Sequence, residues 1–332
     1  MTTNPLPVLD MADLSGDAAS FRARLREATH TMGFFYLRHR IPEPVTSELF
    51  TVAREFFALP EDDKFSIEMS NSSCFRGYTR TGGELTQGAV DWREQIDIGS
   101  ERPAATVDQP PYLRLEGPNQ WPVALPELRP AIESWVERLS GIGMQLIQQW
   151  ALSLGAQRDH FDATFEVPST LLKLVRYPGQ DDAAQGVGSH KDPGILTLLL
   201  IEPGKAGLQV EHDGEWIDVP PVDDAFVVNI GELLEVATDG YLRATQHRVV
   251  SPEIGSERLS IPFFFNPGLD AEVPRIDLPP ELAARARGVE QDASNVLAER
   301  YGENLLKARL RAHPDVAQRH HPDLVRGAAI PQ

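Results

Sequence analysis

Apolar residues recur at steps of three and four through the first half of the chain, a spacing that predicts amphipathic helices. Gly33 and Pro60 are expected to end the first two of these helices. A longer stripe predicts a helix over residues 127–154 that backs the core. The apolar positions of the three stripes are Phe21, Leu25, Ala28 and Met32; Val45, Leu49, Val52 and Phe56; and Leu128, Ile132, Trp135, Leu139, Ile142, Leu146 and Trp150.

From about residue 169 the pattern changes to short apolar and β-branched runs separated by Gly, Pro and Asp, which are typical of strands. The runs read LLKLVRY, ILTLLLIE, LQV, WIDV, AFVVNI, HRVV and RLSIPFFF. Closely spaced short strands predict a mainly β fold with flanking helices, either a jelly roll or a barrel. Residues 281–312 return to a helical pattern, and the segment after His313 is expected to run over the surface. The stretch 100–123, rich in Pro and charge, is expected to connect the two halves.

Composition narrows the class of protein. The 332 residues suffice for a full hydrophobic core, and the formal net charge of −18 disfavours nucleic acid or an anionic membrane as a partner. The longest mainly aliphatic run, residues 195–201, is far shorter than the ~20 residues of a membrane span. The single cysteine, Cys74, cannot form an intramolecular disulfide. We therefore expect a cytoplasmic protein without an obligate protein partner.

The stretch GVGSHKDPGILTLLL, residues 186–200, places His190 and Asp192 two positions apart before an apolar run. Alternate residues of a strand point to the same side, so both side chains could meet at one metal ion. Composition alone predicts roughly 0.6 His-x-Asp pairs by chance, yet the chain has four. The other pairs, expected to be solvated polar residues of helix ends and tails, are His160/Asp162, His313/Asp315 and His321/Asp323.

A third ligand distinguishes the four pairs. His247 opens the run HRVV, so it is expected at the mouth of a strand, and with His190 and Asp192 it would complete a set of two histidines and one carboxylate. His212 is the rival partner of the His160 pair, but its context EHDGEW is a hairpin turn signal typical of exposed residues.

Arg258 and Ser260 lie in ERLSIPFFF, again two positions apart on an expected strand. A guanidinium and a hydroxyl that face the same way can hold a carboxylate. The same letters ERLS occur at residues 137–140, but there they fall within the predicted long helix, where residues two apart do not share a face.

With these residues the chain resembles the iron(II)- and 2-oxoglutarate-dependent oxygenases, and more narrowly their isopenicillin N synthase-like branch. The catalytic-core resemblance rests on GSHKDPGILTLLL, VVNIGELLEVATDG, TQHRVV and ERLSIPFFFNP. LPVLDMADL, TMGFFYLRHRIP, FFALPEDDK, FRGY and WREQIDIG resemble the N-terminal region of that branch. The resemblance implies three parts: an N-terminal α/β region over 1–120, a helix-backed double-stranded β-helix (jelly-roll) catalytic core with a C-terminal helix over 121–312, and a C-terminal tail over 313–332.

The resemblance also implies the site. His190, Asp192 and His247 would be the catalytic metal ligands for Fe(II), leaving an open face for the co-substrate and O2. Arg258 and Ser260 would bind the distal carboxylate of 2-oxoglutarate. A small-molecule substrate would be oxidised with release of succinate and CO2.

Several residues keep two interpretations. Tyr177 matches a position at which the family often places a tyrosine that helps hold the co-substrate, but a packing tyrosine is equally consistent. Asn229 either lies near the metal or caps the turn at Gly231. His39 is expected to pack or be exposed, and Arg176 to be a solvated charge at a strand edge rather than a substrate contact. Candidate substrate contacts are Phe75, Arg76, Tyr78 and Glu84.

Two alternative functions stay open. The first is an iron oxidase like isopenicillin N synthase, in which Arg258 and Ser260 hold the substrate and no 2-oxoglutarate is used. The second is a non-catalytic β-helix protein that retains the ligands. Oxygen-dependent formation of succinate would separate the preferred oxygenase from the oxidase, and a ligand affinity that is unchanged by removal of iron would support the non-catalytic protein.

Overall fold

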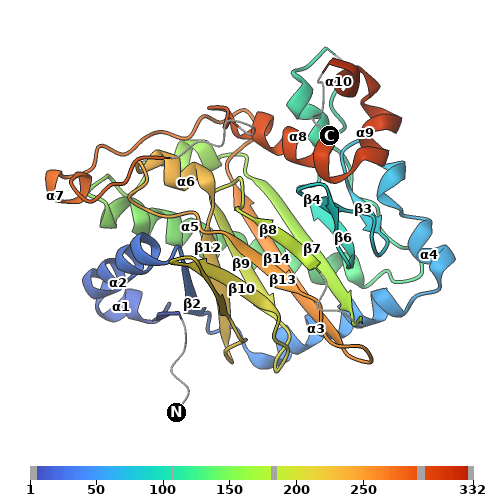
Figure 1. Cartoon of the computed structure of the whole chain (residues 1–332), viewed down its shortest axis with the longest axis horizontal. Coiled ribbons are helices and arrows are strands. Elements are labelled where there is room, and N and C mark those ends of the chain that lie inside the picture. Colours follow the sequence, from blue (N-terminus) through green and yellow to red (C-terminus); the bar gives the residue numbers. More distant parts are fainter. Residues whose placement is uncertain (1–5, 107, 181–184, 290–295, 328–332) are drawn as a thin grey trace.

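Two β-sheets face each other in the computed structural model, which describes residues 6–106, 108–180, 185–289 and 296–327 (Figure 1). The larger sheet has eight strands and the smaller has four. The order in the larger sheet is β1 (Val8–Asp10), β2 (Phe34–Arg38), β12 (Ala225–Ile230), β9 (Leu196–Ile201), β14 (Glu257–Asn266), β7 (Ser169–Pro178), β6 (Glu94–Gly99) and β3 (Gly77–Thr79). The order in the smaller sheet is β11 (Glu215–Asp218), β10 (Leu208–His212), β13 (His247–Val250) and β8 (Gln185–His190).

Neighbouring strands of the larger sheet pair antiparallel, except that β1 and β2 are parallel. A short separate hairpin is formed by β4 (Leu85–Thr86) and β5 (Ala89–Val90). All strands predicted after residue 169 are present. The apolar periodicity gave no indication of β1, β2, β3 or β6, because these strands are short or buried on both faces.

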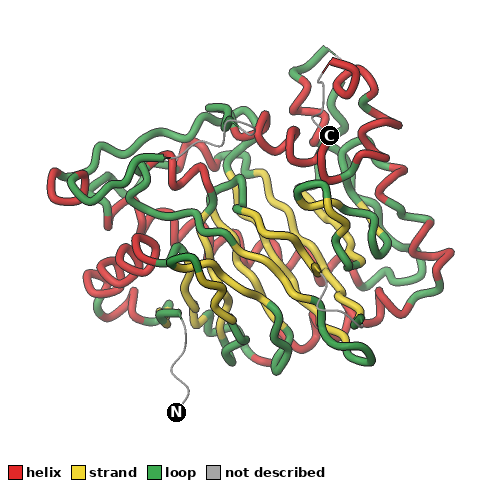
Figure 2. Tube along the Cα trace, viewed as in Figure 1, coloured by secondary structure: helices red, strands yellow, loops and turns green. Residues whose placement is uncertain are grey.

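Helices cover the outer face of the larger sheet and one end of the molecule (Figure 2). The predicted long helix is α5, Leu128–Ser153, which packs on β9 and β14. The other helices are α1 (Asp13–Gly16), α2 (Ala18–Thr31), α3 (Glu43–Ala58), α4 (Glu61–Phe65), α6 (Glu232–Ala237), α7 (Pro280–Ala283), α8 (Tyr301–Ala312), α9 (Pro314–His320) and α10 (Pro322–Gly327). Single 3₁₀ turns are η1 (Met69–Asn71), η2 (Pro111–Leu115) and η3 (Asp162–Phe165).

The alternation of strand β7 separates two hydrophobic layers. Leu172 and Leu174 belong to the large core between the eight-stranded sheet and the helices. Val175 and Tyr177 belong to a smaller core between the two sheets. The side of β7 that carries Tyr177 therefore faces the interior of the sandwich, and the side that carries Leu174 faces the helices.

Two predictions about the C-terminal part are wrong. The helical pattern of 281–312 gives only the short α7 and, much later, α8, and residues 284–289 and 296–300 are not helical. Pro279 and Pro280 allow one turn to start, but Gly288 follows closely and adopts a positive φ of 70°. The segment after His313 is not a surface tail, because α9 and α10 form there and Val316 and Ala317 are buried.

Among the helices that the structure describes, none is long and apolar enough to cross a membrane.

Candidate metal centre

Two histidines face each other across neighbouring strands of the smaller sheet. His190 ends β8 and His247 begins β13, and the antiparallel register makes them direct partners, with ring centroids 4.3 Å apart. Each Nδ1 lies against a backbone carbonyl, 2.8 Å from Gly188 O for His190 and 3.1 Å from Thr245 O for His247. A carbonyl only accepts, so each neutral ring carries its proton on Nδ1 and keeps the Nε2 lone pair for a metal.

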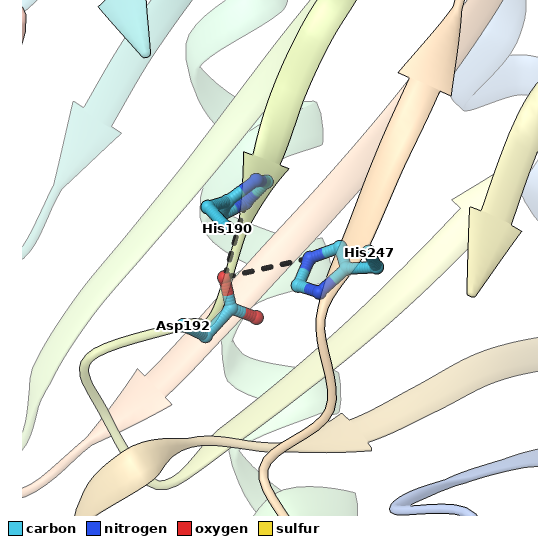
Figure 3. Close-up of side chains that lie close together, drawn as sticks. All are labelled: His190, Asp192 and His247. Carbon is cyan, nitrogen blue, oxygen red and sulfur yellow. Dashed lines mark ion pairs between the residues drawn. The ribbon is translucent and has the colours of Figure 1, made fainter. Parts of the chain in front are cut away.

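Asp192 supplies the third group (Figure 3). Its Oδ1 lies 3.7 Å from Nε2 of His190 and 3.8 Å from Nε2 of His247. The expectation that strand alternation brings His190 and Asp192 together was wrong in its reason, because β8 ends at His190 and Asp192 lies in the loop before β9. The turn that leaves the strand brings the carboxylate back toward the ring.

The other carboxylate oxygen of Asp192 is fixed by two buried side chains. Oδ2 accepts hydrogen bonds from Thr197 Oγ1 at 2.6 Å and from Asn229 Nδ2 at 2.7 Å. Asn229 therefore lies beside Asp192, and among the described residues no side-chain hydrogen bond caps the helix that begins after Gly231. Thr197, on β9, was missed by sequence reasoning, because its position within an aliphatic strand indicated only packing.

The electrostatics of the cluster suit a divalent cation. Burial, with a smaller contribution from His247, lowers the pKa of His190 to about 4, so its imidazole is neutral at neutral pH. Burial raises the pKa of Asp192, but the two histidines and the hydrogen bonds from Thr197 and Asn229 outweigh it and keep the carboxylate ionised. The three ligand atoms lie within 4.8 Å of one another. Two imidazoles and one carboxylate are the donor set typical of non-haem iron(II) with open positions.

A buried arginine, Arg258, lies on the larger sheet, which faces the sheet that carries His190 and His247. Arg258 and Ser260 lie on β14 and are 1% and 2% exposed. Tyr177 of β7 is the cross-strand partner of Arg258, and the guanidinium carbon lies 4.9 Å from the centroid of its ring. Within the part of the chain that the structure describes, Nε and both terminal nitrogens of Arg258 are buried without a hydrogen-bond partner. Burial lowers the pKa of this guanidinium.

The four residues predicted as candidate substrate contacts lie in different parts of the structure. Phe75 is buried with its ring stacked on His321, and Arg76 donates to Leu115 O at 3.3 Å. Tyr78 donates from its hydroxyl to Glu94 at 2.6 Å on the helix-covered side. Glu84 alone joins a charged cluster between the sheets, 3.2 Å from Lys173 Nζ and 2.8 Å from an Arg93 nitrogen. Sequence reasoning missed Arg93 and Lys173: Arg93 lies in WREQIDIG, which supported only the resemblance to the family, and Lys173 lies in LLKLVRY, which predicted only a strand.

Four further side chains can now be placed. Arg176 is not simply solvated, because it forms ion pairs with Glu94 and Glu257. His313 and His321 are buried, so their expected exposure was wrong; His321 Nε2 lies 2.7 Å from Ser73 O. The prediction for His39 is confirmed in its packing form, with the ring against Phe226.

Comparison with known proteins identifies the family. A model of the N-terminal region of non-haem dioxygenases matches residues 6–124, and a model of the 2OG-Fe(II) oxygenase superfamily matches residues 169–267. The chain is 36% identical to the 2-oxoglutarate-dependent dioxygenase frbJ of Dothideomycetidae sp. (strain 11243), over 98% of this chain and 95% of that protein. The chain belongs to the 2OG-Fe(II) oxygenase superfamily.

Other similar proteins agree with this family. Homoarginine-6-hydroxylase 2-ODD-C23.1 of Arabidopsis thaliana is 31% identical, over 91% of this oxygenase and 95% of that protein. A crystal structure of a 2OG-Fe(II) oxygenase family protein from Caulobacter crescentus superposes with a TM-score of 0.76 at 27% identity, over 93% of this chain and 99% of that one. The crystal structure of a full-length Neurospora crassa protein in complex with alpha-KG and thymine gives a TM-score of 0.73 at 25% identity, over 91% and 95% of the two chains.

The predicted jelly-roll fold and the oxygenase class are thereby confirmed. The protein is a 2-oxoglutarate-dependent dioxygenase, whose cofactor is Fe(II) and whose co-substrates are 2-oxoglutarate and O2. It oxidises a C–H bond of a small organic molecule, by hydroxylation, desaturation or ring closure, with release of succinate and CO2. Relatives such as frbJ are 2-oxoglutarate-dependent dioxygenases, which favours this class over the oxidase alternative and over a non-catalytic β-helix protein.

Proposed function

We propose that His190, Asp192 and His247 hold the catalytic iron and that Arg258, Ser260 and Tyr177 hold 2-oxoglutarate. The observations that carry this assignment are the cluster of candidate metal-ligand atoms and the unpartnered guanidinium of Arg258, which is buried opposite Tyr177 on the side of the larger sheet that faces the interior of the sandwich. A buried charge without a partner is costly, and the cost falls when a carboxylate arrives to pair with it. The distal carboxylate of 2-oxoglutarate is an anion of the right kind.

Each neighbouring residue has a distinct task in this proposal. Ser260 lies two residues from Arg258 on the same face of β14 and offers a hydroxyl donor to the same carboxylate. Tyr177 supports the guanidinium from the side through its ring. Thr197 and Asn229 hold Asp192 so that Oδ1 points at the metal position. The bound iron and 2-oxoglutarate supply the oxidising chemistry, and the apolar strand β9 beside Asp192 limits access of water.

The direct test is an anaerobic titration of the purified protein with iron(II) and 2-oxoglutarate, followed by the weak visible charge-transfer band of the chelate. Arg258→Gln should raise the 2-oxoglutarate requirement by about tenfold or more, because a charge-assisted pair is lost. Arg176→Gln is the matched control: it lies on the adjacent strand β7 but points away from the site toward Glu94. His247→Ala should abolish iron binding while the fold is retained.

Two results would contradict the assignment. An unchanged 2-oxoglutarate requirement in Arg258→Gln would remove Arg258 from the co-substrate site. Full iron occupancy in His247→Ala would reject the third ligand. Equal weakening of binding in Arg258→Gln and in Arg176→Gln would point to a general loss of structure instead of a lost contact.

We further propose that the protein belongs to the isopenicillin N synthase-like branch, on the basis of its N-terminal motifs, and that its sequence divides into 1–120, 121–312 and 313–332. The family matches over 6–124 and 169–267 support a boundary near residue 120. The single free cysteine, buried Cys74, supports a reducing, cytoplasmic location. The charge of −18 supports the proposal that neither nucleic acid nor an anionic membrane is a partner.

A further inference from the structure

Arg93 lies where the chain crosses between β8, which ends at His190, and β7, which carries Tyr177. The next residue, Glu94, pairs with Arg176 of β7, next to Tyr177. The residue before Arg93 is Trp92, whose backbone N–H donates to the backbone carbonyl of Gln185 in β8 at 3.1 Å. Arg93 therefore bridges the edge of the sandwich between Tyr177 and the strand that ends at His190.

Register places the Arg93 side chain on the interior of the sandwich. Continuing the antiparallel pairing of β6 and β7 by one residue sets Arg93 opposite Tyr177, which in turn is opposite Arg258. Arg258, Tyr177 and Arg93 thus form one row across three strands. The electrostatics agree, since the Arg93 charge contributes to lowering the pKa of His190.

Hydrogen bonds to the described residues use only part of the Arg93 guanidinium. One terminal nitrogen donates to Glu84 Oε2 at 2.8 Å and to Asp91 Oδ2 at 3.1 Å. Nε is buried without a partner, and no hydrogen bond of the other terminal nitrogen joins it to any residue that the structure describes. A guanidinium has five N–H donors, so three of them have no hydrogen-bond partner among the described residues, on a side chain that is only 10% exposed.

The charges around Arg93 are already balanced without a ligand. Glu84, Asp91 and Asp97 face Arg93, Lys173 and Arg309 in one connected set of ion pairs. Asp91 is further satisfied by Thr86 Oγ1 at 2.7 Å, Gln185 Nε2 at 3.0 Å and Gly188 N at 3.2 Å. The acidic groups therefore have other donors, and the free edge of Arg93 is not needed to hold the fold.

We propose that Arg93 binds a carboxylate of the substrate, so that the oxygenase acts on a small organic acid. This inference rests on the proposed iron and 2-oxoglutarate site, because it takes the open side of that site as the place where substrate binds. A planar guanidinium that presents several N–H groups matches the two oxygens of a carboxylate. The arrangement uses two arginines, one on each side of Tyr177, for two different acids: Arg258 for 2-oxoglutarate and Arg93 for the substrate.

The test uses benzoate and benzamide as a matched pair of probes of nearly equal shape and different charge. Each is added to the anaerobic protein saturated with iron(II) and 2-oxoglutarate, and the relaxation of its protons by the paramagnetic iron is measured by NMR. We expect benzoate to be relaxed and benzamide much less so. Arg93→Gln should weaken benzoate binding by about tenfold or more, Arg93→Lys should recover part of it, and Arg176→Gln should leave it unchanged.

The outcomes separate this inference from the assignment of the co-substrate site. Loss of the chelate band in the wild type would refute the proposed 2-oxoglutarate site. If the chelate band is normal, three results would refute the role of Arg93 without touching the 2-oxoglutarate site. They are no relaxation of benzoate, equal relaxation of benzoate and benzamide, and unchanged benzoate binding in Arg93→Gln. If Arg93→Gln does not fold, Arg93→Lys is compared with the wild type instead: it keeps the charge that faces Glu84 and Asp91 but loses the planar set of N–H donors, so an unchanged benzoate affinity would refute the role of Arg93.

Discussion

The hydrogen bond from Asn229 to Asp192 allows a quantitative prediction about iron affinity. Both anchors of the carboxylate, Asn229 at 2.7 Å and Thr197 at 2.6 Å, end on Oδ2, so together they fix which oxygen faces the two histidines. Asn229→Ala removes one anchor and leaves the three proposed ligands in place. Asp192 can then rotate about the remaining bond, and its Oδ1 spends less time directed at the metal position.

The expected size follows from the chemistry of that bond. A hydrogen bond to a charged group contributes about 1.5–3 kcal/mol to what it stabilises, and each 1.4 kcal/mol corresponds to roughly tenfold in an equilibrium constant. Outer partners of metal ligands typically change affinity by about 10–100-fold. We therefore expect Asn229→Ala to weaken iron(II) binding by about 10–100-fold, and Asn229→Ala combined with Thr197→Val to weaken it by more than either alone.

The assay is anaerobic competition for iron(II) against a coloured chelator, with the fold monitored by circular dichroism. Thr238→Val is the control, since Thr238 is equally buried and donates to Leu234 O at 2.9 Å, away from Asp192. The reasoning would be refuted by an iron affinity of Asn229→Ala within about twofold of the wild type, or by an equal loss in Thr238→Val.

Two further predictions concern stability. Gly141→Ala should raise the melting temperature, because Gly141 is an exposed residue of α5 with no atom within 4 Å of the position that a methyl group would take. Gly143→Ala should lower the melting temperature, because its methyl group would lie 2.6 Å from the Phe265 ring. Shifts of the same sign and size in calorimetry would contradict both expectations. Arg93 and Lys173 hold the pKa of the Glu84 carboxyl well below its ordinary 4.5. The ionised carboxylate therefore stabilises the folded state above pH 4.5, and this stabilisation is lost as pH falls through the lower pKa that Glu84 has in the folded protein. The free energy of unfolding, measured in urea, should therefore differ between Glu84→Gln and the wild type at pH 7, and the two values should converge in acid. A difference that does not change with pH would count against the ion pairs.

Local patterns predicted the parts of the molecule that depend on neighbours in sequence. The apolar stripe gave α5 to within one residue at each end, since one face of that helix is continuously buried. His190, Asp192 and His247 could be chosen because strand context and a resemblance supplied what the dipeptide lacked. The pairing of His190 with His247 across β8 and β13 was not predictable in register, because register depends on strands 57 residues apart.

The parts that could not be predicted depend on contacts between distant segments. Thr197 and Arg93 acquire their importance only when β9 and the start of β6 are brought beside Asp192 and Tyr177. His313 and His321 looked like solvated residues, yet both are buried, and Phe75 stacks on His321 across 246 residues of chain. Composition and spacing carry no information on such packing, since each residue is ordinary in its own stretch.

The docking of α9 on η1 has a consequence for the order in which the protein is made. His320 Nε2 lies 2.9 Å from Ser70 O, and His321 lies against Ser73, so a segment near the C-terminus covers one from the first quarter of the chain. The ribosome delivers the earlier segment long before its cover exists. The apolar surface around Phe75 therefore stays exposed during synthesis until residues 314–321 have been made. Contacts of such large sequence separation close late in folding, because the entropy of bringing distant segments together must be lost first.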